Sequence, residues 1–186
     1  VTHGEKGKQD ICMSFGDKIP YESVEVVHAV GNSPNAAVSA ARLGLASTLV
    51  ADLGRDENGD RCLASLEENG VATGYVTRHR GIPTNYHYVL RYEEERTILV
   101  KHEEYPYVLP HFPPPRWLYL SSLGANSLPY HQAIARWLAA HPETNLAFQP
   151  GTFQIKLGAG ELKDIYALAD LFFCRGHRPF LTLSNI

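Results

Sequence analysis

A glycine and two asparagines near the front of the chain surround the start of a predicted helix. Gly31 lets the backbone approach a ligand closely, and Asn32 and Asn35 flank Pro34, a residue favoured in a first helical turn. Unpaired N–H groups and the positive end of the helix dipole point outward there. An amide both donates and accepts hydrogen bonds, as a polyhydroxylated ligand requires. The alternative is that these residues serve only as caps and turn glycines.

A second glycine-bounded turn follows about twenty residues later. Gly54-x-Asp56-x-x-Gly59 predicts a tight turn that opens a helix, with Asp56 as its cap rather than as a ligand contact. The nine histidines show no zinc-like spacing with cysteine or acidic partners, so we expect no metal site.

The elements that position these residues follow an α/β rhythm in the first part of the chain. We expect a strand, a helix capped by Asn32 or Ser33 and ended by Gly44, a second strand, and a second helix that stops at Gly70. Their predicted ranges are Val24–Val30, Pro34–Leu43, Thr48–Leu53 and Asn58–Asn69.

A hairpin interrupts this rhythm. The runs Thr84–Tyr92 and Arg96–His102 alternate in polarity, which predicts two antiparallel strands with one face drier than the other. A hairpin inserted in an α/β chain is often a flap, so we expect a lid over about 82–104.

After the prolines of segment 110–115 the α/β rhythm resumes. We expect a helix capped by Ser127, a helix that starts at Glu161, and three core strands. The predicted ranges are Trp117–Leu120, Pro129–Ala140, Leu146–Phe148, Glu161–Leu168 and Leu171–Cys174. This order predicts a partial domain over 11–174, between a lead-in tail (1–10) expected to be disordered and an irregular tail (175–186).

Composition limits the classes of function. The chain has 186 residues, 44% of them hydrophobic, and a net charge of -3, which argues against a nucleic-acid partner. No apolar run approaches the roughly 18 residues that span a bilayer, so we expect no membrane partner. Three widely spaced cysteines favour buried, reduced thiols and a cytoplasmic protein.

The spacing Gly31-x3-Asn35-x-Ala37-x6-Gly44-x9-Gly54 resembles the N-terminal signature of the ribokinase-like (PfkB-type) carbohydrate kinases. Four further segments resemble that family's second turn, second helix, lid and core strands, in the same order. They are Gly54–Gly59, Leu66–Val71, Thr84 with Glu95–Thr97, and the pair Trp117–Ser122 and Phe148–Thr152. Val30 and Ser33 depart from the family pattern, which bears on the choice of ligand. The resemblance implies an incomplete three-layer α/β core of the ribokinase type with a small hairpin lid.

The resemblance also implies site residues and a reaction. Sugar-contacting positions fall on Gly31, Asn32 and Asn35, and we expect three further contacts at Asn85 and His87 of the lid and Ser122 of a core strand. The family transfers the γ-phosphoryl group of ATP, with Mg²⁺, to a hydroxyl of a sugar or nucleoside.

The family's late Gly-Ala-Gly-Asp motif, which carries its catalytic aspartate, has no match here. Gly158-Ala159-Gly160-Glu161 is similar, but it comes too early in the chain to be that motif. We therefore expect the sugar-binding part of a kinase, without an ATP site or a catalytic residue and inactive alone. One alternative is a non-catalytic sugar-binding module that forms a homodimer through its lid hairpin. A different α/β nucleotide-binding protein is disfavoured, because neither a Walker loop nor a Gly-x-Gly-x-x-Gly loop occurs.

Overall fold

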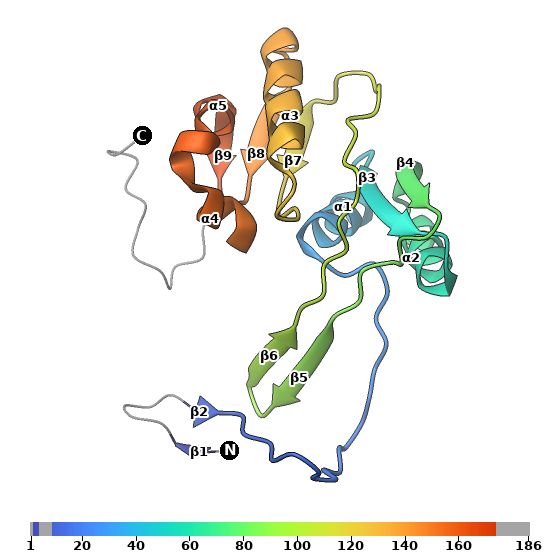
Figure 1. Cartoon of the computed structure of the whole chain (residues 1–186). Coiled ribbons are helices and arrows are strands. Elements are labelled where there is room, and N and C mark those ends of the chain that lie inside the picture. The colour runs from blue at the N-terminus through green and yellow to red at the C-terminus, as the bar shows by residue number, and fades with distance from the viewer. Residues whose placement is uncertain (1, 4–8, 174–186) are drawn as a thin grey trace.

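Two parallel α/β units make up most of the chain, and the connector between them, residues 80–116, carries a hairpin (Figure 1). The computed structural model describes residues 2–3 and 9–173. Predicted features at Cys174 and in the tail 175–186 lie outside the described residues.

The first unit contains a two-stranded sheet and two helices. In chain order it comprises α1 (Asn32–Arg42), β3 (Thr48–Gly54), α2 (Glu57–Glu68) and β4 (Ala72–His79). Strands β3 and β4 pair in parallel. Its core is formed by small and aliphatic side chains from α1, α2, the start of β3 and the residue before β4. They are Ala37, Leu49, Leu66 and Val71.

The second unit contains a three-stranded parallel sheet in the order β7–β8–β9. It comprises β7 (Trp117–Leu120), α3 (Leu128–Ala140), β8 (Asn145–Phe148), α4 (Thr152–Glu161), α5 (Lys163–Leu168) and β9 (Ala169–Phe172). Leu146 and Phe148 of the central strand are fully buried against α3 and α5. Because β8 is covered in this way, the second unit has the larger core.

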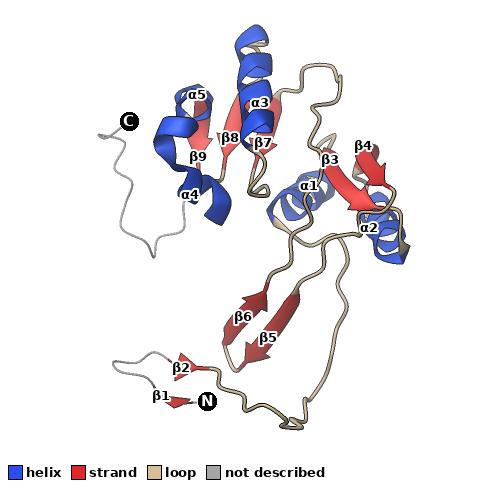
Figure 2. Ribbon diagram, in the orientation of Figure 1, coloured by secondary structure: helices blue, strands red, loops and turns tan. Residues whose placement is uncertain are grey.

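The hairpin stands away from both units (Figure 2). It pairs β5 (Tyr88–Tyr92) with β6 (Glu95–Leu99) in antiparallel register. Another antiparallel pair, β1 (Thr2–His3) and β2 (Gln9–Asp10), lies within the stretch predicted to be a tail.

Aromatic side chains of the connector hold the two units together. The Phe112 ring lies 5.8 Å from the ring of Tyr75 on β4 and 4.8 Å from that of Trp137 on α3, measured between centroids. The buried Tyr105 donates its hydroxyl hydrogen to the carbonyl of Pro83, and its own carbonyl accepts from the amide of Asn126. The connector is therefore part of the packing and not a loose tether.

The strand predicted over Val24–Val30 is wrong. That segment pairs with no strand in the described part of the chain, and Val24, Val26 and Val27 are exposed. A β-branched run forms a strand only where a neighbouring edge satisfies its backbone groups. Conversely, the sequence predicted no strand at Ala72–His79, where β4 pairs in parallel with β3.

Several predicted ends and caps also need correction. Gly31 occupies the N-cap of α1 in place of Asn32 or Ser33. Ser127 does occupy the N-cap position of α3, as predicted, but its hydroxyl donates to the carbonyl of Gly124 and makes no side-chain capping bond. Glu161 ends α4 rather than starting a helix, because the chain kinks at Gly158 and a short α5 begins at Lys163.

The hairpin is shorter than predicted and neither face is dry. Leu90 is half-buried, and the other residues of β5 and β6 are exposed. The reason is its position, since it projects away from both cores (Figure 1). The expectation of buried thiols is also wrong for Cys12, which is exposed, whereas Cys62 is half-buried.

Candidate functional site

The first turn of α1 leaves its asparagines facing outward. Asn32 and Asn35 are exposed, while Ala37 is buried against the core of the first unit. The Oδ1 atom of Asn35 accepts a long hydrogen bond of 3.5 Å from the N–H of Gly31. One weak local contact leaves the Asn35 amide available to a ligand.

The start of this helix is fixed to the end of a core strand. The hydroxyls of Ser33 and Ser121 lie 2.6 Å apart, and Ser121 is buried directly after β7. Ser122, the next residue, is exposed. Ligands of open α/β sheets bind beyond the carboxyl ends of the strands, and this contact places the α1 turn at that end of β7.

The beginning of α4 lies at the same place. A Cβ atom at Gly151 would overlap the side chain of Ser122, so the two backbones approach as closely as only glycine permits. Behind them the fully buried Gln154 accepts from the N–H of Gly151 at 3.2 Å and donates to the carbonyl of Leu123 at 3.2 Å. This network fixes the segments that follow β7 and β8.

The chain segments on either side of the hairpin, which we call its arms, contain residues 85–87 and 101–103 and are hydrogen-bonded to each other. Asn85 Oδ1 accepts from the N–H of Glu103 at 2.7 Å, and His87 Nδ1 accepts from the N–H of Lys101 at 3.2 Å. The Asn85 side chain therefore has a structural role of its own. His87 has its Nε2 atom left for another partner.

Three aromatic rings in successive edge-to-face contacts connect these arms to α4. The His87 and His102 rings have centroids 5.2 Å apart, and the His102 ring lies 5.3 Å from that of Phe153, the second residue of α4. Burial lowers the pKa of His102, and the nearby His87 lowers it further. A neutral His102 next to Phe153 at neutral pH follows from this shift.

The predicted site residues thus fall into two connected groups. Gly31, Asn32 and Asn35 lie at the α1 turn beside Ser122, and Asn85 and His87 lie on the arms. The arms reach the same strand ends through His102 and Phe153.

Sequence reasoning missed four of the residues that build this arrangement, namely Ser121, Gly151, His102 and Phe153. The consecutive serines after a predicted core strand were a usable signal. The ring contacts depend on long-range packing and had no local signal.

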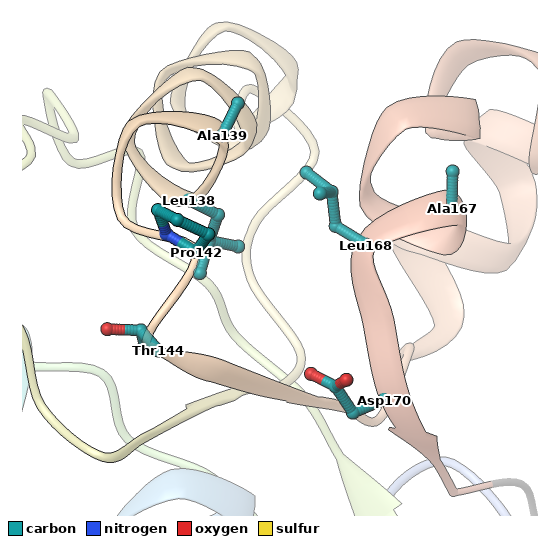
Figure 3. Close-up of a pocket in the computed structure, with 7 residues that line it drawn as sticks. All are labelled: Leu138, Ala139, Pro142, Thr144, Ala167, Leu168 and Asp170. Atoms are coloured by element: carbon teal, nitrogen blue, oxygen red, sulfur yellow. The ribbon is translucent and has the colours of Figure 1, made fainter.

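A hollow of about 320 Å³ lies at the other end of the second sheet (Figure 3). It is lined by residues at the ends of α3 and α5 and by Thr144 and Asp170, where β8 and β9 begin. It therefore lies at the amino ends of the strands, away from Ser122 and Gly151.

Within residues 2–3 and 9–173, no group of three or more His, Cys, Asp or Glu side chains is placed to hold a metal ion. No helix in these ranges is long and apolar enough to cross a membrane.

Several solved structures share this fold, among them proteins described as a fructokinase, a sugar kinase and a PfkB protein. A fructokinase from Vibrio cholerae O395, solved with fructose, ADP and a calcium ion, matches with a TM-score of 0.58 and 20% identity, over 76% of this chain and 51% of that one. A PfkB protein from Polaromonas sp. JS666 matches with a TM-score of 0.61 and 18% identity, over 74% and 52%. A sugar kinase from Pyrococcus horikoshii, solved with ATP, matches with a TM-score of 0.58 and 18% identity, over 76% and 52%.

These likenesses show the ribokinase-like α/β fold predicted from the sequence, and this chain spans about half the length of the structures it matches. No curated protein is detectably similar to it in sequence. The family model described as pfkB family carbohydrate kinase matches residues 7–174. The chain therefore belongs to the pfkB family of carbohydrate kinases.

Proposed function

We propose that this chain is the sugar-binding part of an ATP-dependent carbohydrate or nucleoside kinase that acts in the cytoplasm. The contact between Ser33 and Ser121 carries the proposal, because it brings the exposed asparagines of the α1 turn to the carboxyl end of β7. Six residues would contact the sugar, namely Gly31, Asn32, Asn35, Asn85, His87 and Ser122.

The chemistry available to these residues is binding and orientation. Amide and imidazole groups donate to and accept from hydroxyls, and the dipole of α1 favours electron-rich oxygen atoms at its first turn. Phosphoryl transfer also needs a base for the hydroxyl proton and positive charge near the phosphates. We derive no transfer step on this chain, because neither a base nor positive charge for the phosphates is assigned to its six proposed contact residues.

We assign ATP, Mg²⁺ and the catalytic base to the part of the parent protein that corresponds to the half of the related kinase structures not covered by this chain. Support comes from the kinase structures solved with ATP and with ADP and a calcium ion, of which the chain covers about half.

Two measurements on the purified chain test the proposal. Calorimetric titration with D-fructose, D-ribose and adenosine should detect millimolar binding of at least one compound. An assay of ADP formation from ATP with the same compounds should give no turnover. Robust turnover would refute the assignment of the chemistry to the other half, and absence of binding by all three would refute the sugar site.

A second candidate is a non-catalytic module that pairs through its hairpin. It is favoured by the exposed apolar side chains on both faces of that hairpin, including Tyr88 at 62%, Val89 at 49% and Leu99 at 53% exposure. Sedimentation equilibrium of the chain and of a Val89→Lys variant tests this. A dimer that the substitution dissociates supports the module, and a wild-type monomer removes it.

A further inference from the structure

The carboxylate of Asp56 joins helix α2 to the first arm of the hairpin. Its Oδ1 atom accepts from the N–H of Gly59 at 2.8 Å, which caps α2. The same carboxylate accepts twice from Thr84, from the N–H to Oδ2 and from the hydroxyl to Oδ1, each at 2.7 Å. One side chain thus bonds to the first turn of α2 and to Thr84, which lies 28 residues further along the chain than Asp56.

Thr84 is buried, and its hydroxyl both donates and accepts a hydrogen bond. Besides donating to Asp56, the hydroxyl oxygen accepts from the N–H of Gly54 at 3.0 Å. Thr84 therefore bonds to the end of β3 as well as to the N-cap of α2. Valine has nearly the same shape but can make neither hydroxyl bond.

The contact region between Gly54, Asp56 and Thr84, which we call the junction, is tightly packed. A Cβ atom at Gly54 would lie 2.5 Å from the Thr84 nitrogen and 2.7 Å from the carbonyl oxygen of Ile82. Tyr105 bonds to Pro83 from the other arm at 2.8 Å. Both arms are therefore anchored at this point, before the chain runs out into the exposed hairpin.

We propose that Asp56 and Thr84 are positioning residues for the sugar site, which set the direction of the arm that carries Asn85 and His87. Asn85 follows Thr84 directly, so any rotation of the Thr84 backbone moves both side chains. This inference rests on the proposed function, because it concerns the same site. Neither residue contacts the ligand.

Charge at the junction supports a permanently ionised Asp56. Burial raises its pKa, but the hydrogen bonds from Thr84 and Gly59 and the charge of Arg78 outweigh burial, so the pKa lies below its ordinary value of 3.8. The guanidinium of Arg78 donates to the Gly54 carbonyl at 2.8 Å and to Asp60 at 2.7 Å. The anchor therefore holds throughout the neutral pH range.

Amide hydrogen exchange of the ligand-free chain tests the anchor directly. In Thr84→Val, exchange at the hydrogen-bonded amides of the arms, those of Lys101 and Glu103, should rise by about tenfold, as expected for the loss of two hydrogen bonds. Amides in the middle of α2 should be unchanged. Thr84→Ser restores the hydroxyl and should return exchange in the arms to near the wild-type rate.

Two further variants separate positioning from general destabilisation. Asp56→Ser keeps an efficient cap for α2 but has no second oxygen for Thr84, so exchange in the arms alone should rise. Thr73→Val removes a comparable hydroxyl bond to a carboxylate, that of Glu67 on the surface, and should leave the arms unchanged. Equal increases in the arms and α2, or no increase in the arms, would overturn the proposal.

Ligand binding is measured in a second, separate experiment. If wild type binds D-fructose or D-ribose, Thr84→Val should weaken that binding by about tenfold and Thr84→Ser should restore it. If the sugar site is wrong, wild type will not bind, yet the exchange result still decides whether Asp56 anchors the arm. A bound sugar with equal affinity for wild type and Thr84→Val would refute the positioning role.

Discussion

The hydroxyls of Ser33 and Ser121 are 2.6 Å apart although the residues are separated by 88 positions in sequence. Ser33 lies in the first turn of α1 and Ser121 directly follows β7, so the contact joins the two α/β units at the end of the sheet where a ligand is expected. The position of the asparagine turn depends on this contact.

A double-mutant cycle measures that contact. Ser33→Ala and Ser121→Ala should each lower the free energy of unfolding, and Ser121→Ala should cost more because its hydroxyl is buried. The coupling between them should be about 1 kcal/mol, the usual net value of one hydrogen bond. Urea denaturation of the four proteins gives the value, and strictly additive effects would show that the contact does not form in solution.

Glycine at position 59 is required by its neighbours. A Cβ atom there would overlap the carbonyl oxygen of Gly54 and come within 3.0 Å of the Thr84 hydroxyl. Gly59→Ala should therefore destabilise the chain by about 1–3 kcal/mol, despite alanine's higher helix propensity. Gly160→Ala is the matched control, since that helical glycine has open space around it and should gain up to about 1 kcal/mol. Equal melting temperatures for both variants would contradict the close packing.

The joint between the units depends on Phe112. Its buried ring contacts Tyr75 and Trp137, one from each unit, and Phe112→Ala should cost about 3–5 kcal/mol. Phe15→Ala removes the same side chain from a fully exposed position and should change stability by less than about 0.5 kcal/mol. Thermal melts of both variants check this, and a small effect at Phe112 would mean that the units are not packed together.

Stability should fall in mild acid because of His131. This side chain is buried, its Nδ1–H donates to the Ser127 carbonyl at 2.8 Å, and its Nε2 has no partner in the described part of the chain. Burial lowers the pKa below the ordinary 6.5. The unfolded chain therefore takes up a proton first as pH falls below about 6.5, and stability drops by up to about 1.4 kcal/mol per pH unit.

A substitution identifies the group responsible. His131→Leu should make the loss of stability below pH 6.5 less steep, in urea denaturation at a series of pH values. The part due to His102, whose pKa burial also lowers, should remain. His111→Leu changes an exposed histidine and should keep the wild-type slope. An unchanged slope in His131→Leu would assign the acid sensitivity to other groups.

The sequence predicted what local patterns determine. Gly44, with a φ of +85°, directly follows the C-cap of α1, α2 is capped by Asp56, and β7 has the predicted bounds. Glycines after a C-cap, acidic N-caps and apolar runs act over a few residues.

What it failed to predict depends on distant partners. Val24–Val30 has strand-forming residues but no neighbouring edge, whereas β4 contains Gly74 and is a strand because β3 pairs with it. The same distinction applies to the site. Asn35 was recognisable from its place in a helix start, but the rings of His102 and Phe153 meet only through the folded connector.

In the proposed site, the exposed Asn35 amide binds a sugar hydroxyl at the α1 turn. Isothermal titration calorimetry with D-fructose and D-ribose should show at least tenfold weaker binding for Asn35→Ala than for wild type, with an unchanged melting temperature. Asn58→Ala, on α2, is the matched control and should bind like wild type. Equal affinities for Asn35→Ala and wild type would show that the Asn35 amide does not bind the sugar.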